Sequence, residues 1–217
     1  MIEISAFRWV PPFAQGLVRD LRVRWALEEA GLPYEARLIG SEDQSSSDYR
    51  RLQPFGQVPY YKDGALELFE TGAIVLHVGE RGGTLLPADP AGRARAIAWM
   101  FAALNSVEPF VMNLASIDLF YPDEQWAKLR RPGAQEMVEK RLADLETWLG
   151  DRDWLEGSFT GGDLIMVSVL RILRHTDLVA QRPALEAYRL RGEARPAFQR
   201  ALSAQMAAFE ENAPPQA

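Results

Sequence analysis

Residues 52–78 decide the fold, and they read LQPFGQVPYYKDGALELFETGAIVLHV. Two short apolar runs in this stretch flank Asp63-Gly64, a dipeptide that strongly favours a two-residue hairpin turn. Glu70 and Thr71 come next, and they open a run with apolar residues at helical spacing, which predicts a helix over residues 70–80. The stretch therefore predicts a β-hairpin that leads directly into a helix.

The residues before this stretch predict a strand, a helix and a second strand. The predicted elements are a strand over 2–7, a helix over 13–30, a strand over 34–39, a loop over 40–48 and a short helix over 48–52. Leu17, Leu21 and Trp25 share one face of the helix, which Gly31 and Pro33 end. The first eighty residues thus have the order βαβ and then ββα.

No strand signal follows residue 81. A proline-containing segment over 82–90 reads as a linker. Helical patterns are then expected over 91–120, 136–149, 160–175, 183–190 and 196–211. We therefore expect an α/β domain over 1–81, the linker over 82–90 and an all-helical domain over 91–217.

Composition excludes several classes of function. The 217 residues include no cysteine and only two histidines, His77 and His175, which excludes a disulfide framework and disfavours a multi-histidine metal site. The net charge is −6 with basic residues spread along the chain, so we expect no nucleic-acid partner. The longest apolar runs are far shorter than the ~20 residues that cross a bilayer, and the N-terminus lacks a signal-peptide pattern. We therefore expect a soluble, cytoplasmic protein that binds no metal and does not associate with a membrane.

Val58-Pro59 is the first candidate binding element. A proline that opens an edge strand after a turn is a candidate for a cis peptide bond, and an ordinary trans proline is the alternative. With a cis bond, the N–H and C=O groups of Val58 would face a groove and could pair with an extended peptide.

Glu70-Thr71 is the second candidate, at the start of the predicted helix. Either residue could simply cap the helix. Alternatively, Thr71 and the helix N-terminus bind an anion while Glu70 binds an ammonium group, which together would suit an amino-acid zwitterion. By contrast, Thr160 and Asp163 in the run TGGD form a capping box, to which we assign a folding role only.

At this point the sequence resembles a known family, the cytosolic glutathione transferases. Residues 52–78 resemble the glutathione-binding half of these enzymes, and residues 22–35 (RVRWALEEAGLPYE) resemble their first helix and second strand. Residues 84–96 (TLLPADPAGRARA) and 159–163 (FTGGD) match the family's linker and capping motif. The resemblance implies a thioredoxin-like domain followed by an all-helical domain, a cis Pro59 and a homodimer.

The family pattern also implies roles for individual residues. Val58 would pair with the cysteinyl unit of glutathione, Pro59 would hold that main chain in place, and Gln57 would add a contact. Glu70 and Thr71 would hold the γ-glutamyl end. A hydrophobic electrophile would bind in a pocket that involves Phe13, Met100, Asn105, Val111 and Met112.

The catalytic position departs from the family pattern, which has Tyr, Ser or Cys there. Residues 6–24 contain none of these, and the segment PPFAQ has Pro11 where the CPFAQ of omega-like members has its cysteine. The remaining candidates for stabilising the thiolate are the side chains of Trp9, Gln15 and Arg19, and N–H groups near Phe13 and Ala14 at the start of the predicted helix.

We interpret the protein as a glutathione transferase that stabilises the thiolate of glutathione and conjugates it to a hydrophobic electrophile. The missing hydroxyl supports an alternative, a glutathione-binding or structural protein with little turnover. A third function, reduction of mixed disulfides with glutathione, is disfavoured by the absence of cysteine from the sequence.

Overall fold

The computed structural model describes residues 1–214, and the chain divides into two compact units. The first comprises Met1–Leu85 together with the segment from Arg195 onward, and the second comprises Leu86–Ala194. The sequence predicted a different grouping, in which everything from residue 91 to 217 formed the helical domain. The last three residues of that predicted domain, 215–217, lie outside the described part of the chain.

A four-stranded mixed sheet forms the centre of the first unit. Its strands are β1 (Ile2–Phe7), β2 (Tyr34–Ile39), β3 (Tyr61–Asp63) and β4 (Leu66–Leu68), in the order β2-β1-β3-β4. β1 and β2 are parallel, whereas β3 is antiparallel to both β1 and β4. The predicted hairpin turn at Asp63-Gly64 is present, with Gly64 at a positive φ of 59°.

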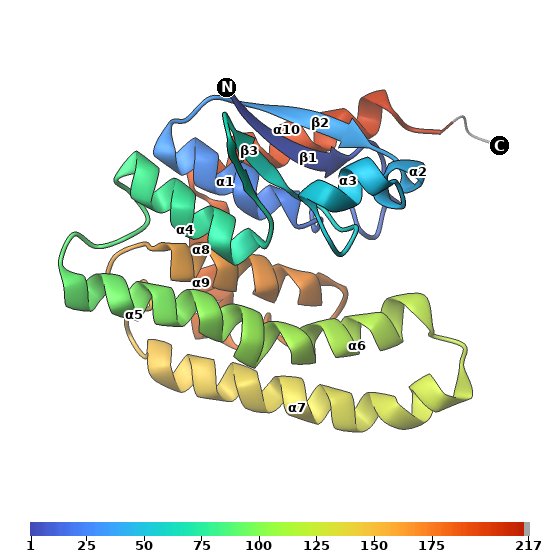
Figure 1. The fold of residues 1–217 in the computed structure, drawn as a ribbon. Helices are drawn as coiled ribbons and strands as arrows, with labels where there is room; N and C mark the ends of the chain where they lie inside the picture. Colours follow the sequence, from blue (N-terminus) through green and yellow to red (C-terminus); the bar gives the residue numbers. More distant parts are fainter. Residues whose placement is uncertain (215–217) are drawn as a thin grey trace. The chain divides into compact units, whose positions relative to one another are not determined.

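The helices of this unit are α1 (Asp20–Ala30), α2 (Ser41–Gln44), α3 (Ser47–Leu52), α4 (Thr71–Gly82) and α10 (Pro196–Glu211). α1 packs beside α4 beneath the strands (Figure 1). The order βαβ-ββα and the mixed sheet confirm the predicted thioredoxin-like domain.

α10 completes the first unit by packing on α1. The Phe198 ring meets the buried Trp25 ring edge-on, with 4.9 Å between ring centroids. The Gln205 amide donates to Asp20 at 2.7 Å, and Arg195 pairs with Glu29. Burial raises the pKa of Asp20, and the adjacent Arg24 partly offsets that effect. These contacts explain why the last helix belongs with the sheet.

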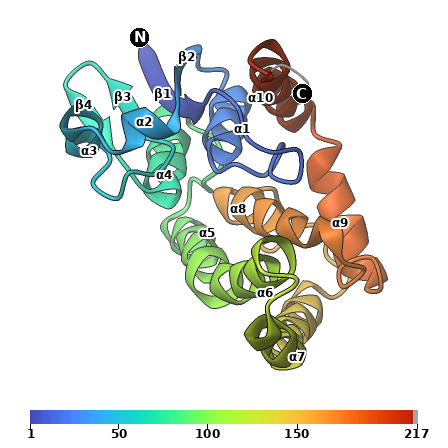
Figure 2. The ribbon, with the colours of Figure 1, turned by 90° about the vertical axis from the view of Figure 1, so that its right-hand side faces the viewer.

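The second unit is helical, as predicted. It contains α5 (Pro90–Phe101), a π-helical segment η1 (Ala102–Val107), α6 (Glu108–Phe120), α7 (Gln125–Leu149), α8 (Gly161–Leu170), a 3-10 segment η2 (Arg171–His175) and α9 (Pro183–Glu193). Every residue of α8 is buried, and this helix packs against α5 and α9 (Figure 2). α8 is therefore the centre of the core of this unit.

The run Pro90–Phe120 is long and apolar enough to cross a membrane when judged by length and composition alone. Its most apolar window is 44% buried, and α6 packs against α7 while α5 packs against α8. The core helix of a water-soluble protein has these same properties, so the run is weak evidence for a membrane span.

Candidate functional site

The pairing of the strands brings three chain segments to one end of the sheet: the segment after β1, the segment before β3 and the segment after β4. β1 pairs with β3 as Ile4↔Tyr61, and the main-chain bond from Ser5 N–H to Tyr60 O, 3.1 Å long, continues that register by one residue. β1 runs on to Phe7 in the direction of the Val58-Pro59 segment, because the two chains are antiparallel here. The segment after β1 and the Val58-Pro59 turn therefore share one end of the sheet.

The third segment reaches this end through β4. β3 pairs with β4 as Tyr61↔Leu68, so the start of β3 and the end of β4 lie side by side. Val58-Pro59 comes shortly before β3, and Glu70-Thr71 shortly after β4. The two elements that the sequence singled out as binding candidates therefore adjoin the same end of the β3–β4 hairpin.

The Val58–Pro59 peptide bond is cis, as predicted. Within the described residues, no hydrogen bond engages the main-chain N–H or C=O of Val58. Both residues are buried overall, whereas the neighbouring Gln57 is exposed. An unpaired main-chain N–H and C=O of this kind can pair with an extended peptide.

Glu70 has a positive φ of 70°, which is uncommon for a residue other than glycine and marks a place to look for function. Its side chain does not cap α4, so the capping alternative does not hold for Glu70. Its carboxylate is exposed and has no ion pair or hydrogen bond within residues 1–214. Thr71 is the first residue of α4 and is 5% exposed. An unpaired carboxylate beside a helix N-terminus suits a zwitterion.

The predicted start of the first helix was wrong. The sequence placed it near Phe13, but α1 begins at Asp20, and residues 12–17 form consecutive turns. Gly16 has a φ of 75°, a left-handed conformation that an α-helix does not continue through. The helix N-terminus expected beside PPFAQ as a thiolate site is therefore absent there, and the Ala14 N–H donates to Pro11 O at 2.9 Å.

The three catalytic candidates differ in what already engages them. The Gln15 amide donates to the Val10 carbonyl at 3.1 Å, so it stabilises the turn. Arg19 takes part in an interaction of its own and immediately precedes α1. The indole N–H of Trp9 has no hydrogen bond within the described chain, and the side chain is partly exposed. Trp9 is therefore the candidate whose donor is available.

The residues predicted for the electrophile pocket differ in exposure. Phe13 is 40% exposed, Asn105 is exposed and Met112 is partly exposed. Met100 and Val111 are buried, with 3% and 0% exposure, so neither presents surface to a ligand in this conformation. Their common pocket remains a prediction.

Two side chains that the sequence analysis did not assign lie directly behind Val58-Pro59. Ser5 and Tyr49 are buried, and their hydroxyls are 2.8 Å apart. No local pattern could reveal the pairing, because 44 residues separate the two in the chain.

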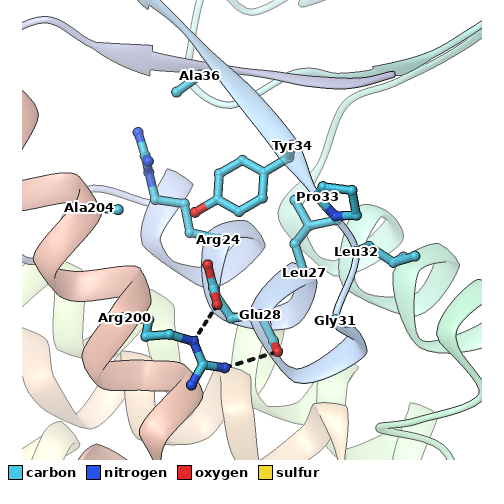
Figure 3. Close-up of a pocket in the computed structure, with 10 residues that line it drawn as sticks. All are labelled: Arg24, Leu27, Glu28, Gly31, Leu32, Pro33, Tyr34, Ala36, Arg200 and Ala204. Carbon is cyan, nitrogen blue, oxygen red and sulfur yellow. Dashed lines mark hydrogen bonds and ion pairs between the residues drawn. The ribbon is translucent and has the colours of Figure 1, made fainter.

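A separate hollow of about 540 Å³ lies between α1, the start of β2 and α10. Arg24, Leu27 and Tyr34 line it, and the ion pair between Arg200 and Glu28, with a nitrogen–oxygen distance of 2.6 Å, crosses its rim (Figure 3). None of the predicted site residues lines this hollow. Within residues 1–214 there is also no group of three or more acidic, histidine or cysteine side chains placed to hold a metal.

Comparison with known proteins gives the chain a family. Residues 15–80 match the family described as glutathione S-transferase, N-terminal domain. Glutathione S-transferase F14 of Arabidopsis thaliana is 31% identical over 191 residues, which cover 80% of this chain and 75% of that protein. Disulfide-bond oxidoreductase YghU of Escherichia coli is 35% identical over 174 residues, which cover 74% of this chain and 56% of that protein.

A solved structure agrees with these sequence matches. A glutathione transferase from Burkholderia graminis, with two glutathione molecules bound per subunit, is 26% identical and superposes with a TM-score of 0.79. The superposition covers 93% of this chain and 87% of that one. A relative that matches over three quarters of its length, together with the shared fold and the domain match, shows that this chain belongs to the cytosolic glutathione transferase family.

Proposed function

We propose that this protein binds glutathione along the edge formed by Val58-Pro59 and Glu70-Thr71 and conjugates it to a hydrophobic electrophile. The observation that carries the proposal is the unpaired main chain of Val58, at the same edge as the unpaired carboxylate of Glu70. A tripeptide with a zwitterionic end satisfies both features at once.

Each residue would serve a different part of glutathione. The cysteinyl unit would pair with the N–H and C=O of Val58 as an added strand does. The γ-glutamyl carboxylate would accept from the Thr71 hydroxyl and the first N–H groups of α4, and its ammonium would lie beside Glu70. The exposed Gln57 would add a polar contact.

The thiol must then lose its proton to become the nucleophile. A free thiol with a pKa near 8.5 is only a few per cent ionised at neutral pH, so a nearby donor that lowers this pKa raises the reactive fraction. The indole N–H of Trp9 is the side-chain donor we favour, because the Gln15 amide is already engaged. The thiolate sulfur attacks the electrophilic carbon and the leaving group departs with the electron pair.

Within the first unit, the residue that we propose for contact with the electrophile is Phe13, from the segment after β1, because its side chain is 40% exposed. A generic aryl halide is a suitable first probe for the electrophile.

Calorimetry with glutathione and conjugation of 1-chloro-2,4-dinitrobenzene test this proposal together. Binding with turnover supports it. Binding without turnover would instead favour a glutathione-binding protein with little activity, and no heat and no thermal stabilisation at several millimolar glutathione would leave only a structural role.

A second candidate is the glutathione-dependent reduction of disulfides. The matched Escherichia coli protein is named a disulfide-bond oxidoreductase, and the Burkholderia graminis structure holds two glutathione molecules per subunit. Two bound glutathiones would make a cysteine-free reduction possible. The first thiolate attacks the disulfide RSSR to give GSSR and RS⁻, and the second attacks GSSR to give GSSG and RS⁻. Turnover of 2-hydroxyethyl disulfide that exceeds aryl halide conjugation would favour this function.

We also propose a cytoplasmic homodimer, on the basis of the family resemblance. Sedimentation equilibrium that returns about 24.4 kDa, the mass of a single chain, would contradict the dimer. Cell fractionation tests the location.

A further inference from the structure

A chain of hydrogen bonds passes behind the Val58-Pro59 turn and joins its two flanking residues. The Tyr60 N–H donates to Ser5 Oγ at 2.8 Å, the Ser5 and Tyr49 hydroxyl oxygens are 2.8 Å apart, and the Tyr49 hydroxyl donates to Gln57 O at 2.6 Å. The two hydroxyls thus connect the carbonyl before the turn to the N–H after it.

The direction of every bond in this chain follows from counting hydrogens. A carbonyl oxygen only accepts, so the single hydroxyl hydrogen of Tyr49 points to Gln57 O. The hydrogen between the two hydroxyls must therefore come from Ser5, which in turn accepts from Tyr60. Donors and acceptors run in one direction, from Tyr60 to Gln57, and such an ordered chain is mutually reinforcing.

The chain replaces a contact that a tight turn makes directly. In a hydrogen-bonded β-turn the N–H of the fourth residue reaches the carbonyl of the first. Gln57 and Tyr60 flank the bend at Val58 with the same spacing, but the Gln57 carbonyl and the Tyr60 N–H are each bonded to a hydroxyl. The two hydroxyls thus occupy the Gln57 carbonyl and the Tyr60 N–H. The N–H and C=O of Val58 remain unpaired within the described residues.

We propose that Tyr49 and Ser5 are positioning residues for glutathione, and that their two hydroxyls hold the Val58 main chain in the conformation that pairs with the cysteinyl unit. This inference rests on the proposed function, because it concerns how the same edge binds glutathione. In this role both side chains act through the main chain around Val58 and not through contact with the thiol.

Two further observations fit a positioning role. Tyr49 is 2% exposed and Ser5 is fully buried, so water does not compete for either hydroxyl. Burial raises the pKa of Tyr49, and the hydrogen bond with Ser5 partly offsets this, so the hydroxyl keeps the hydrogen that it donates across the neutral pH range.

The variant Tyr49→Phe tests the inference, because it removes one hydroxyl and keeps the ring. We expect the Kd of glutathione, measured by calorimetry, to rise by about 3- to 10-fold, the range for one neutral hydrogen bond. The KM for glutathione should rise in parallel while kcat with 1-chloro-2,4-dinitrobenzene stays within about twofold, because binding of the ground state and the transition state weaken together. The matched control is Tyr61→Phe, whose buried ring lies in β3 and whose hydroxyl faces Arg81 at 3.5 Å, outside the chain of bonds.

Double variants distinguish a positioning role from a general loss of structure, because they show whether two substitutions affect glutathione affinity independently. Ser5→Ala and Tyr49→Phe break the same chain of hydrogen bonds. The Kd of the double variant for glutathione should therefore lie within about twofold of the Kd of the weaker-binding single variant. Thr71→Val acts on the other end of the ligand, so its effect should multiply with that of Tyr49→Phe. If Tyr49→Phe does not fold, Ser5→Ala carries the same comparison with Thr71→Val.

The outcomes distinguish the inference from the function on which it rests. Unchanged glutathione affinity in Tyr49→Phe, or an equal loss in Tyr61→Phe, would overturn the positioning role while the proposed function stands. An unaltered protein that does not bind glutathione would overturn both.

Discussion

Thr71 is the residue whose side chain most directly tests how the γ-glutamyl end is held. Its hydroxyl lies at the first position of α4, where Thr71→Val keeps the shape and removes the donor. We expect glutathione affinity to fall by about 1.5–3 kcal/mol, the range for a hydrogen bond to a charged group, which is roughly 10- to 150-fold. Calorimetry measures this, with Thr147→Val on an exposed face of α7 as the control. Unchanged affinity would reduce Thr71 to part of a helix start.

Trp9 and Gln15 carry a prediction about the thiol. Each is a neutral donor worth about 0.5–1.5 kcal/mol, so Trp9→Phe should raise the pKa of the bound thiol by about one unit or less. Gln15→Ala should raise it less, because its amide is bonded to Val10 O. Thiolate absorbance against pH measures both, and aryl halide activity should fall no more than about 10-fold. A rise above two units for either variant would identify a dedicated catalytic donor.

At the scale of single residues, the sequence predicted a feature set by neighbouring residues and missed a contact between residues that are far apart in the chain. The cis bond before Pro59 was visible in a few consecutive residues. The hydroxyls of Ser5 and Tyr49 meet only after β1 and α3 have folded together, so no spacing in the sequence indicates them.

Among the elements, the start of α8 carries a stability prediction. Thr160 accepts from the Gly162 N–H, and Asp163 accepts from the Thr160 N–H, which confirms the predicted capping box. Thr160→Ala should lower the free energy of unfolding by about 0.5–2 kcal/mol, with little change in glutathione affinity. Urea unfolding and calorimetry measure the two effects. A large loss of affinity in a folded variant would mean that the box also serves the binding site.

Asp163 explains why this box is buried so completely. Its Oδ1 also accepts from the Leu155 N–H and from the Tyr188 hydroxyl, so one carboxylate joins a loop, α8 and α9. Burial raises the pKa of Asp163, and its donors partly offset the rise.

Element boundaries were predicted less well than element types. The turns before α1 were missed because Leu17 and Val18 continue the apolar helical pattern, while the left-handed Gly16 shows only in the backbone. The polar segment that reads as a loop contains the short helix α2. α7 begins eleven residues before its predicted start at 136 and continues through Pro132.

For the whole molecule, the C-terminal helix is predicted to stabilise the N-terminal unit. Phe198 is 1% exposed and packs on Trp25, so Phe198→Ala should cost about 3–5 kcal/mol of unfolding free energy. Phe101→Ala, at a side chain that is 58% exposed, is the control and should change it by about 0.5 kcal/mol or less. Urea unfolding measures both, and a cost below 1 kcal/mol for Phe198→Ala would contradict the packing. The sequence placed α10 with the other helices, because its apolar stripe does not say which partner it covers.

The central claim is that the Val58-Pro59 turn and Glu70-Thr71 together hold glutathione, and a crystal structure of the complex with glutathione tests it most directly. We expect the cysteinyl unit to pair with both main-chain groups of Val58 at about 2.9 Å. The γ-glutamyl carboxylate should lie at Thr71 and the start of α4. Glutathione bound at another place, with the main chain of Val58 still unpaired, would contradict the claim.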